Sequence, residues 1–235
     1  PAFKTPEPTT LIAKSTQNSL IESGLLQVPL RPDAITPSKD SYLRKLLPNV
    51  NEGDNTALFV TYLGSDRTLV AFDQGQIANA VAGKHLQSAT LKMYIKSTLD
   101  NWGSGRTIEA RPLTATWAEG NGYNENIIVP IRGTGSGVTW NCAVDTNINN
   151  SNKDCATSWN GGTFGTVSSS VLITNGKTGW VSFDVTGDVN AYLSGAKQNY
   201  GWIIKKSDET KTGLVTFVSS ESLENRPELV LTFVP

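Results

Sequence analysis

The sequence is poor in several residue types that mark particular functions. Its 235 residues include one histidine, one methionine and two cysteines, and only 17% of them are charged. Twenty Lys and Arg balance 21 Asp and Glu, so the formal net charge is −1. A nucleic-acid-binding face needs a basic excess, and so does a polybasic membrane anchor. We therefore expect neither a nucleic-acid partner nor an anchor of that kind.

Long apolar runs are also missing. The longest cover only a few residues, such as 69–72, whereas a transmembrane helix needs about 20. This pattern predicts no membrane insertion. No signal-peptide pattern is present, and a chain that begins at Pro1 is expected to be a mature, processed form. The apolar fraction of 38% is too high for a disordered chain, and the length suits one large all-β domain.

The scarcity of histidine limits the catalytic possibilities. His85 is the only candidate base for a nucleophilic triad, and no Gly-x-Ser-x-Gly motif accompanies it. Paired carboxylates hydrolyse glycosides without histidine, and Glu119 and Asp184 are the best placed beside aromatic residues. We favour the simpler interpretation, in which both carboxylates bind backbone amides at strand ends. The sequence therefore predicts a protein that is not an enzyme.

The two cysteines, Cys142 and Cys155, flank a polar stretch rich in Asn, Asp and Ser. A zinc site needs four ligands, and the chain offers only one histidine in addition to the two cysteines. A metal site and two free thiols are the alternatives, and we favour a disulfide. Such a bond closes a small loop and contributes roughly 3 kcal/mol in the chain-entropy model. It also indicates an oxidising compartment, so we expect a secreted protein, extracellular or at the cell surface.

Alternation of apolar and polar side chains dominates the chain from residue 39 onward. Leu91, Met93 and Ile95 alternate with polar neighbours, which is typical of a half-buried strand. Many short strands with turn-rich gaps predict an all-β fold, an antiparallel jelly-roll-like β-sandwich over 39–235. One short helix is expected at 187–193, capped by Thr186. Strands are expected at 41–46, 57–63, 68–73, 91–96, 106–116, 181–185, 201–205, 214–219 and 229–233.

Two segments stand apart from this pattern. The polar stretch 121–166 is expected to be a long insertion that the disulfide staples. Residues 1–38 are rich in proline and predict an extended N-terminal arm, because Pro29 lacks an N–H and suits only an edge or added strand. The arm's apolar residues form a candidate donor strand, which completes either its own sheet or that of a neighbouring copy. They are Leu11, Ile12, Leu20, Leu26, Val28 and Leu30.

Aromatic residues beside polar loops are candidates for sugar stacking. Trp102, Trp140 and Trp159 lie next to loops rich in Asn and Gly, and Tyr123 extends the set. An exposed aromatic ring at such a place stacks on a pyranose ring. For each of these residues a packing role is the simpler alternative.

The remaining tryptophans lie in strand-like strings and are expected in the core: Trp117, Trp180 and Trp202. Lys92 and Lys96 share one face of a predicted strand. That face either meets an acidic polysaccharide or is simply solvated.

Oxygen-rich clusters raise the question of a metal. Residues 145–149 begin like a calcium loop, but Asn150 replaces the sixth-position glycine and Ala156 the twelfth-position glutamate, so the segment is not an EF-hand. A second cluster comprises Asn49, Asn51 and Asp54. Asx turns explain both clusters, and a structural calcium is the alternative. No other cofactor is expected. Asn149 begins the one candidate glycosylation sequence, Asn-Asn-Ser.

Nine short strings in a fixed order resemble the DNRLRE-domain family, a group of secreted jelly-roll-like β-sandwich modules. They are DSYLR at 40–44, NVNEG at 49–53, LVAFD at 69–73, ATLKMY at 89–94, TWAEG at 116–120, VTWN at 138–141, GWVSFDVT at 179–186, NYG at 199–201 and RPEL at 226–229. The resemblance covers about residues 39–235 and implies no catalytic motif, with polysaccharide binding in some members. The longer segment after Trp140, which holds the cysteines, and the arm depart from the family.

These features lead to two functional hypotheses. The preferred one is a non-catalytic extracellular structural protein, a subunit of a filament or surface fibre that polymerises by N-terminal strand donation. Its partners are copies of itself, because a head-to-tail contact that does not close generates a filament. The alternative is a carbohydrate-binding module that recognises an extracellular polysaccharide.

Overall fold

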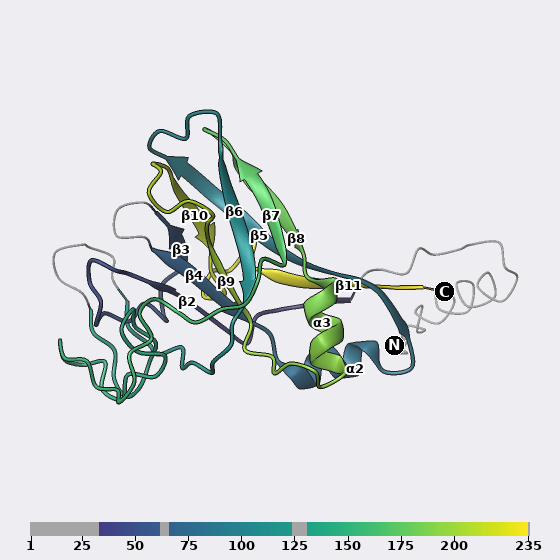
Figure 1. Cartoon of the computed structure of the whole chain (residues 1–235), viewed down its shortest axis with the longest axis horizontal. Coiled ribbons are helices and arrows are strands. Elements are labelled where there is room, and N and C mark those ends of the chain that lie inside the picture. Colours follow the sequence, from purple (N-terminus) through teal and green to yellow (C-terminus); the bar gives the residue numbers. More distant parts are fainter. Residues whose placement is uncertain (1–32, 62–65, 124–130, 235) are drawn as a thin grey trace, which may run out of the picture. The chain divides into compact units, whose positions relative to one another are not determined.

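The computed structural model describes residues 33–61, 66–123 and 131–234, which form two packed antiparallel sheets (Figure 1). The predicted all-β sandwich is confirmed. The six-stranded sheet contains β1 (Asp33–Ile35), β3 (Ala57–Val60), β5 (His85–Leu99), β8 (Gly179–Asp184), β10 (Leu214–Val218) and β11 (Glu228–Val234). The five-stranded sheet contains β2 (Lys39–Leu43), β4 (Arg67–Ala71), β9 (Trp202–Lys206), β6 (Arg106–Pro112) and β7 (Ser169–Ile173), in that spatial order.

The long strand β5 organises the six-stranded sheet. Thr90 pairs with residues of both β8 and β11, so these two strands lie on opposite edges of β5. Ile95 pairs with residues of both β8 and β10, so β10 also lies opposite β8. β10 and β11 therefore follow one another along the same edge of β5, separated by the loop 219–227.

The main hydrophobic core fills the space between the two sheets. Leu91, Met93 and Ile95 of β5 point into it and are fully buried, as their alternation predicts. Phe183 of β8 and Trp202 of β9 join them from the neighbouring strands. The lining of this core thus follows the period-2 pattern of the strands.

A second hydrophobic cluster lies on the other face of the five-stranded sheet. Leu43, Leu69 and Ile203 supply its sheet side, and Leu113 and Trp117 belong to the long segment that covers them. That segment joins β6 to β7, and its described parts are 113–123 and 131–168. We call it the covering segment. Because of it, three strands of the five-stranded sheet are buried on both faces: β2, β4 and β9 are buried at nearly every position, whereas β6 and β7 are not.

Two short helices lie side by side at one end of the strands (Figure 1). The expected helix is present as α3 (Thr186–Leu193), but Thr186 is its first residue and not its cap; its N-cap, Val185, makes no side-chain capping bond. The second helix, α2 (Gln74–Val81), was not predicted from the sequence. It begins after Asp73, whose carboxylate accepts a hydrogen bond from the Gln76 amide at 2.8 Å. An Asp at that position is a common N-cap.

The predicted arm falls mostly outside the described residues. All six candidate donor residues, Leu11, Ile12, Leu20, Leu26, Val28 and Leu30, lie there, so strand donation stays a prediction. Within the described part, β1 (Asp33–Ile35) pairs with β11 in the six-stranded sheet. The division of the chain at residue 38 also stays a prediction.

Candidate functional site

The structure places Trp102 in the main core and not on a binding surface. Its side chain is 0% exposed, and its indole Nε1 donates a hydrogen bond to the Leu99 carbonyl at 2.8 Å. Gly213 has a φ of 109°, and a Cβ there would lie 2.9 Å from Trp102 Cδ2, so backbone packs directly on the ring. The expectation that Trp102 stacks on a sugar is therefore wrong.

Trp140 and Trp159 are also packing residues, since both belong to the second cluster and are 8% and 5% exposed. Gly161 lies against the Trp140 ring, and the guanidinium of Arg67 lies 4.7 Å from its centroid. The Trp159 indole donates to Thr163 Oγ1 at 3.2 Å. Their sequence neighbours are polar because the covering segment is a surface loop, while the indoles themselves face the sheet beneath it.

Tyr123, the fourth candidate for stacking, belongs to neither hydrophobic cluster of the described residues. Its backbone exchanges two hydrogen bonds of 2.9 Å with Ile131. The structure therefore brings Trp140 and Trp159 together in one cluster but does not assemble the four predicted aromatics into one surface.

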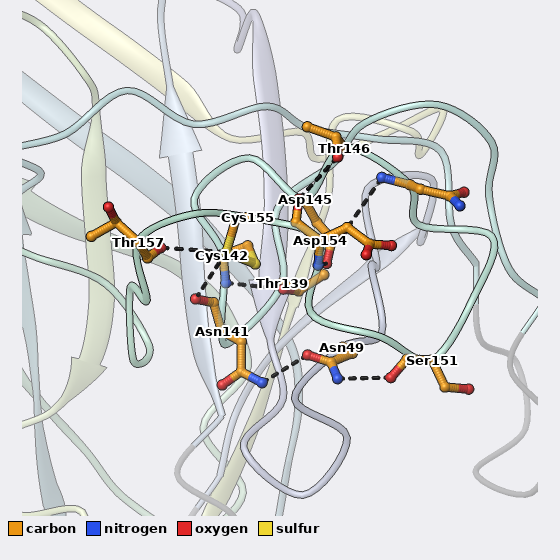
Figure 2. Close-up of a disulfide and its surroundings, with 11 residues drawn as sticks. Asn49, Thr139, Asn141, Cys142, Asp145, Thr146, Ser151, Asp154, Cys155 and Thr157 are labelled. Atoms are coloured by element: carbon orange, nitrogen blue, oxygen red, sulfur yellow. Dashed lines mark hydrogen bonds between the residues drawn. A yellow bond between two sulfur atoms is a disulfide. The ribbon is translucent and has the colours of Figure 1, made fainter.

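The predicted disulfide between Cys142 and Cys155 is present and lies within the covering segment (Figure 2). Asn49 anchors this region to the loop after β2: its Oδ1 accepts from Asn141 Nδ2 at 2.7 Å, and its Nδ2 donates to the Ser151 carbonyl at 2.8 Å. The disulfide loop is thus held both covalently and by side-chain bonds to the rest of the domain.

The oxygen-rich sequences of this region are engaged in turns. Asp145 accepts from the Asn147 amide at 3.1 Å, and Asn147 accepts from the Asn149 amide at 3.3 Å. Asn51, which is 3% exposed, donates to the carbonyls of Glu119 and Val138 and accepts the amides of two glycines. The Asx-turn interpretation accounts for these contacts. Glycosylation of Asn149, which is exposed, stays a prediction.

Glu119 and Asp184 both bind backbone amides, as the simpler interpretation expects. The Glu119 carboxylate accepts from the Asp40 amide at 2.6 Å, and burial raises the pKa of this carboxyl to about 7. Asp184 accepts from the amide and hydroxyl of Thr186 at 3.0 and 2.6 Å, which lowers the pKa of its exposed carboxyl. Asp184 thereby fixes the turn into α3.

An aromatic pair lies on the outer face of the six-stranded sheet, beside the lysines of the predicted strand face. Tyr94 of β5 and Trp180 of β8 are cross-strand partners, with ring centroids 5.3 Å apart and an interplanar angle of 85°. Lys92 Nζ lies 4.5 Å from the Trp180 ring centroid and 3.3 Å from Glu228 Oε2 of β11. Both rings are partly exposed.

The expectation that Trp180 lies in the core is therefore wrong, whereas Trp117 and Trp202 are buried as expected. The sequence pattern already indicates the outward position of Trp180. Val181 and Phe183 point inward, so the same alternation places Trp180 and Ser182 on the opposite, polar face. The alternation of the inward-facing residues thus assigns Trp180 to the outward face of β8, even though its neighbours in the sequence are apolar.

We call the outward-facing set Lys92, Tyr94, Lys96, Trp180 and Ser182 the sheet-face platform. It combines two aromatic rings with two ammonium groups and a hydroxyl on adjacent strands. Aromatic rings bind the apolar C–H face of a sugar, and ammonium and hydroxyl groups bind its oxygens. Chemically, the platform suits a flexible, extended ligand laid on a sheet.

A groove near α3 offers a second, more enclosed surface. Its cavity volume is about 330 Å³, and its lining includes Leu113, Tyr192, Lys197, Gln198 and Tyr200. Tyr192 is buried, and its hydroxyl has no hydrogen-bond partner among the described residues. The groove lies at the end of β6, away from the strand pair that carries the platform.

Comparison with known families gives one match. Residues 131–233 match the model of carbohydrate-binding module family 96. The match includes the disulfide, β7 to β11 and Trp180, and it covers less than half of the chain. No curated protein matches the chain. None of the helices in the described ranges is long and apolar enough to cross a bilayer.

Proposed function

We propose that this protein is a non-catalytic carbohydrate-binding module and that the sheet-face platform is its glycan-binding surface. The observation that carries the proposal is the partly exposed Tyr94–Trp180 pair with Lys92 beside it, on a strand within the family match and its neighbour. The family match supports carbohydrate binding. Polymerisation has no comparable support, because the donor-strand residues lie outside the described part of the chain. The resemblance to DNRLRE modules, which include polysaccharide binders, agrees with this function.

The charge of the platform favours an acidic polysaccharide. Lys92 and Lys96 extend from alternate positions on the outer face of β5. Lys92 pairs with Glu228, and the side chain of Lys92 is 30% exposed. A sugar carboxylate takes the place of Glu228 as partner of Lys92 while the pyranose ring stacks on an aromatic face. An extracellular location fits this ligand and the disulfide.

Isothermal titration and affinity gel electrophoresis with polygalacturonate, hyaluronate, xylan and mannan test this proposal. We expect binding to an acidic polymer, and a loss of about 10- to 30-fold in Trp180→Ala, because central aromatic anchors contribute about 1.4–2 kcal/mol or more. Lys92→Gln weakens binding to the acidic polymers, whereas Lys153→Gln, an exposed lysine in the covering segment, serves as the matched control.

Three results contradict the proposal in different ways. Binding that is lost in Tyr200→Ala but kept in Trp180→Ala moves the site to the groove. Equal binding of neutral and acidic polymers removes the role of the lysines. Absence of binding to every polymer, with both wild type and controls folded by circular dichroism, removes the platform as a glycan site for these sugar classes.

A further inference from the structure

Three carboxylates from distant parts of the sequence meet near the start of β2. Asp40 lies in β2, Glu119 lies in the covering segment, and Glu221 lies in the loop 219–227 between β10 and β11. One carboxylate oxygen of each lies within 4.8 Å of the other two. We call this group the carboxylate triad. It shares no residue with the sheet-face platform or the groove.

Asp40 is the buried member of the triad, with 0% of its surface exposed. Its Oδ2 accepts a hydrogen bond from the Ser220 amide at 2.7 Å, but its Oδ1 has no hydrogen-bond partner in the described part of the chain. A buried carboxylate oxygen without a partner carries a large desolvation cost. Such an oxygen points to a ligand that the chain itself does not supply.

Lys39 compensates the charge of the triad only in part, through its electrostatic attraction to Glu119. Across residues 33–61, 66–123 and 131–234, none of the three carboxylates forms an ion pair. The nearby Lys39 directs its Nζ to the Trp117 carbonyl at 2.5 Å and over the Trp117 ring at 4.2 Å. Burial, and then the charge of Glu221, raise the pKa of Asp40, which shows the cost of holding these groups as anions.

Short hydrogen bonds hold the carboxylates in place. The Asp40 amide donates to Glu119 Oε1 at 2.6 Å. The hydroxyls of Ser219 and Ser220 donate to Glu221 at 2.9 and 3.1 Å. A carboxylate oxygen can accept more than one hydrogen bond or metal contact, so these bonds orient the triad and leave room for a further ligand.

The chemistry of the ligands selects the kind of cation. All three are carboxylate oxygens, and calcium accepts irregular arrangements of such ligands at about 2.3–2.6 Å. Magnesium requires about 2.0–2.1 Å and a regular octahedron, and zinc favours nitrogen and sulfur ligands. We propose that Asp40, Glu119 and Glu221 bind one divalent cation of the size of calcium, with backbone carbonyls or water completing its coordination.

Such an ion joins three parts of the fold that are far apart in sequence. It links the first strand of the five-stranded sheet, the covering segment and the loop that separates β10 from β11. Asn51 already ties the same part of the covering segment to the loop after β2, through the Glu119 carbonyl at 2.6 Å. The cation would therefore stabilise the packing of the covering segment on its sheet, independently of any glycan.

Calcium titration of the full chain, after treatment with EDTA and dialysis, tests the site without any carbohydrate. We expect one calcium per chain by equilibrium ⁴⁵Ca binding. Thermal unfolding at a calcium concentration of 100 Kd should shift upward by roughly 5–10 °C relative to EDTA. Magnesium at the same concentration should give a smaller shift.

Glu221→Gln is the decisive variant because it removes the charge, keeps the shape of the side chain and leaves one oxygen to accept a serine hydrogen bond. We expect it to lose the calcium-dependent shift, whereas Glu224→Gln, an exposed residue in the same loop, keeps it. Asp40→Asn, checked for folding by circular dichroism, should behave like Glu221→Gln. The proposal is overturned if wild type binds no calcium, if both triad variants still bind it, or if Asp145→Asn alone abolishes binding. Because the readouts are metal binding and stability, these outcomes are independent of glycan binding.

Discussion

The five-stranded sheet carries a second hydrophobic cluster on the face away from the main core, whereas the same face of the six-stranded sheet carries lysines, hydroxyls and aromatic rings. The covering segment makes this difference, because it brings Trp117, Trp140 and Trp159 onto the five-stranded sheet. A tryptophan under the segment therefore contributes to stability. Trp180, on the outer face of the six-stranded sheet, is only partly buried in the described part of the chain. The tryptophans of this domain thus differ in exposure according to whether the covering segment lies over them.

The largest expected effect on stability is at the covered sheet. Trp140→Ala should lower the free energy of unfolding by about 3–5 kcal/mol, because it removes a buried ring and leaves a cavity between Gly161 and the sheet. Urea denaturation monitored by circular dichroism measures this loss. A decrease below about 1 kcal/mol would mean that the covering segment packs only loosely on its sheet.

Removal of the disulfide should come next. The double variant Cys142→Ser with Cys155→Ser should lose roughly 2–3 kcal/mol, because the bond closes a short loop of sequence separation 13. Hydrogen exchange should show the loss mainly in the covering segment, with the amides of β5 still protected. If β5 exchanged equally fast, the two sheets would unfold as one unit and the comparison between them would not extend to local stability.

The smallest effect is expected on the uncovered sheet. Trp180→Ala should change the free energy of unfolding by about 1 kcal/mol, since it loses an edge-to-face contact with Tyr94 and little buried area. The same urea titration measures it, with Ser182→Ala as the control on the same strand. A loss comparable with that of Trp140→Ala would show that the platform is a structural element, which would weaken its assignment as a binding surface.

The strands themselves were largely predictable from the sequence. Alternation at Leu91, Met93 and Ile95, and at Val181 and Phe183, identified β5 and β8 and their buried faces, because the alternate positions of both strands are partly or fully exposed in the described part of the chain. The expected strand 106–116 ends earlier, at Pro112, where the chain leaves the sheet for the covering segment. β7 was missed, since its short serine-containing sequence carries little hydrophobic signal.

The candidate sites were less predictable because they depend on contacts between distant residues. The apolar string 69–72 fits a strand buried on both faces, which is the sequence sign of a covered sheet. The string does not show which segment covers the sheet. From the sequence alone, Trp140 and Trp159 are therefore candidates for sugar stacking, because their sequence neighbours are polar. The carboxylate triad was beyond sequence reasoning for the same reason, because positions 40, 119 and 221 approach one another only in the folded chain.

The place of β11 in the six-stranded sheet has a consequence for biosynthesis. This strand is the last in chain order, yet it lies between β5 and β1 and pairs with both. Most of the strand pairs in that sheet join residues far apart along the chain, which slows folding. During synthesis, half of one edge of β5 must therefore stay unpaired until residues 228–234 have left the ribosome. A cell that makes this domain has to keep that strand edge from aggregating until the final strand arrives.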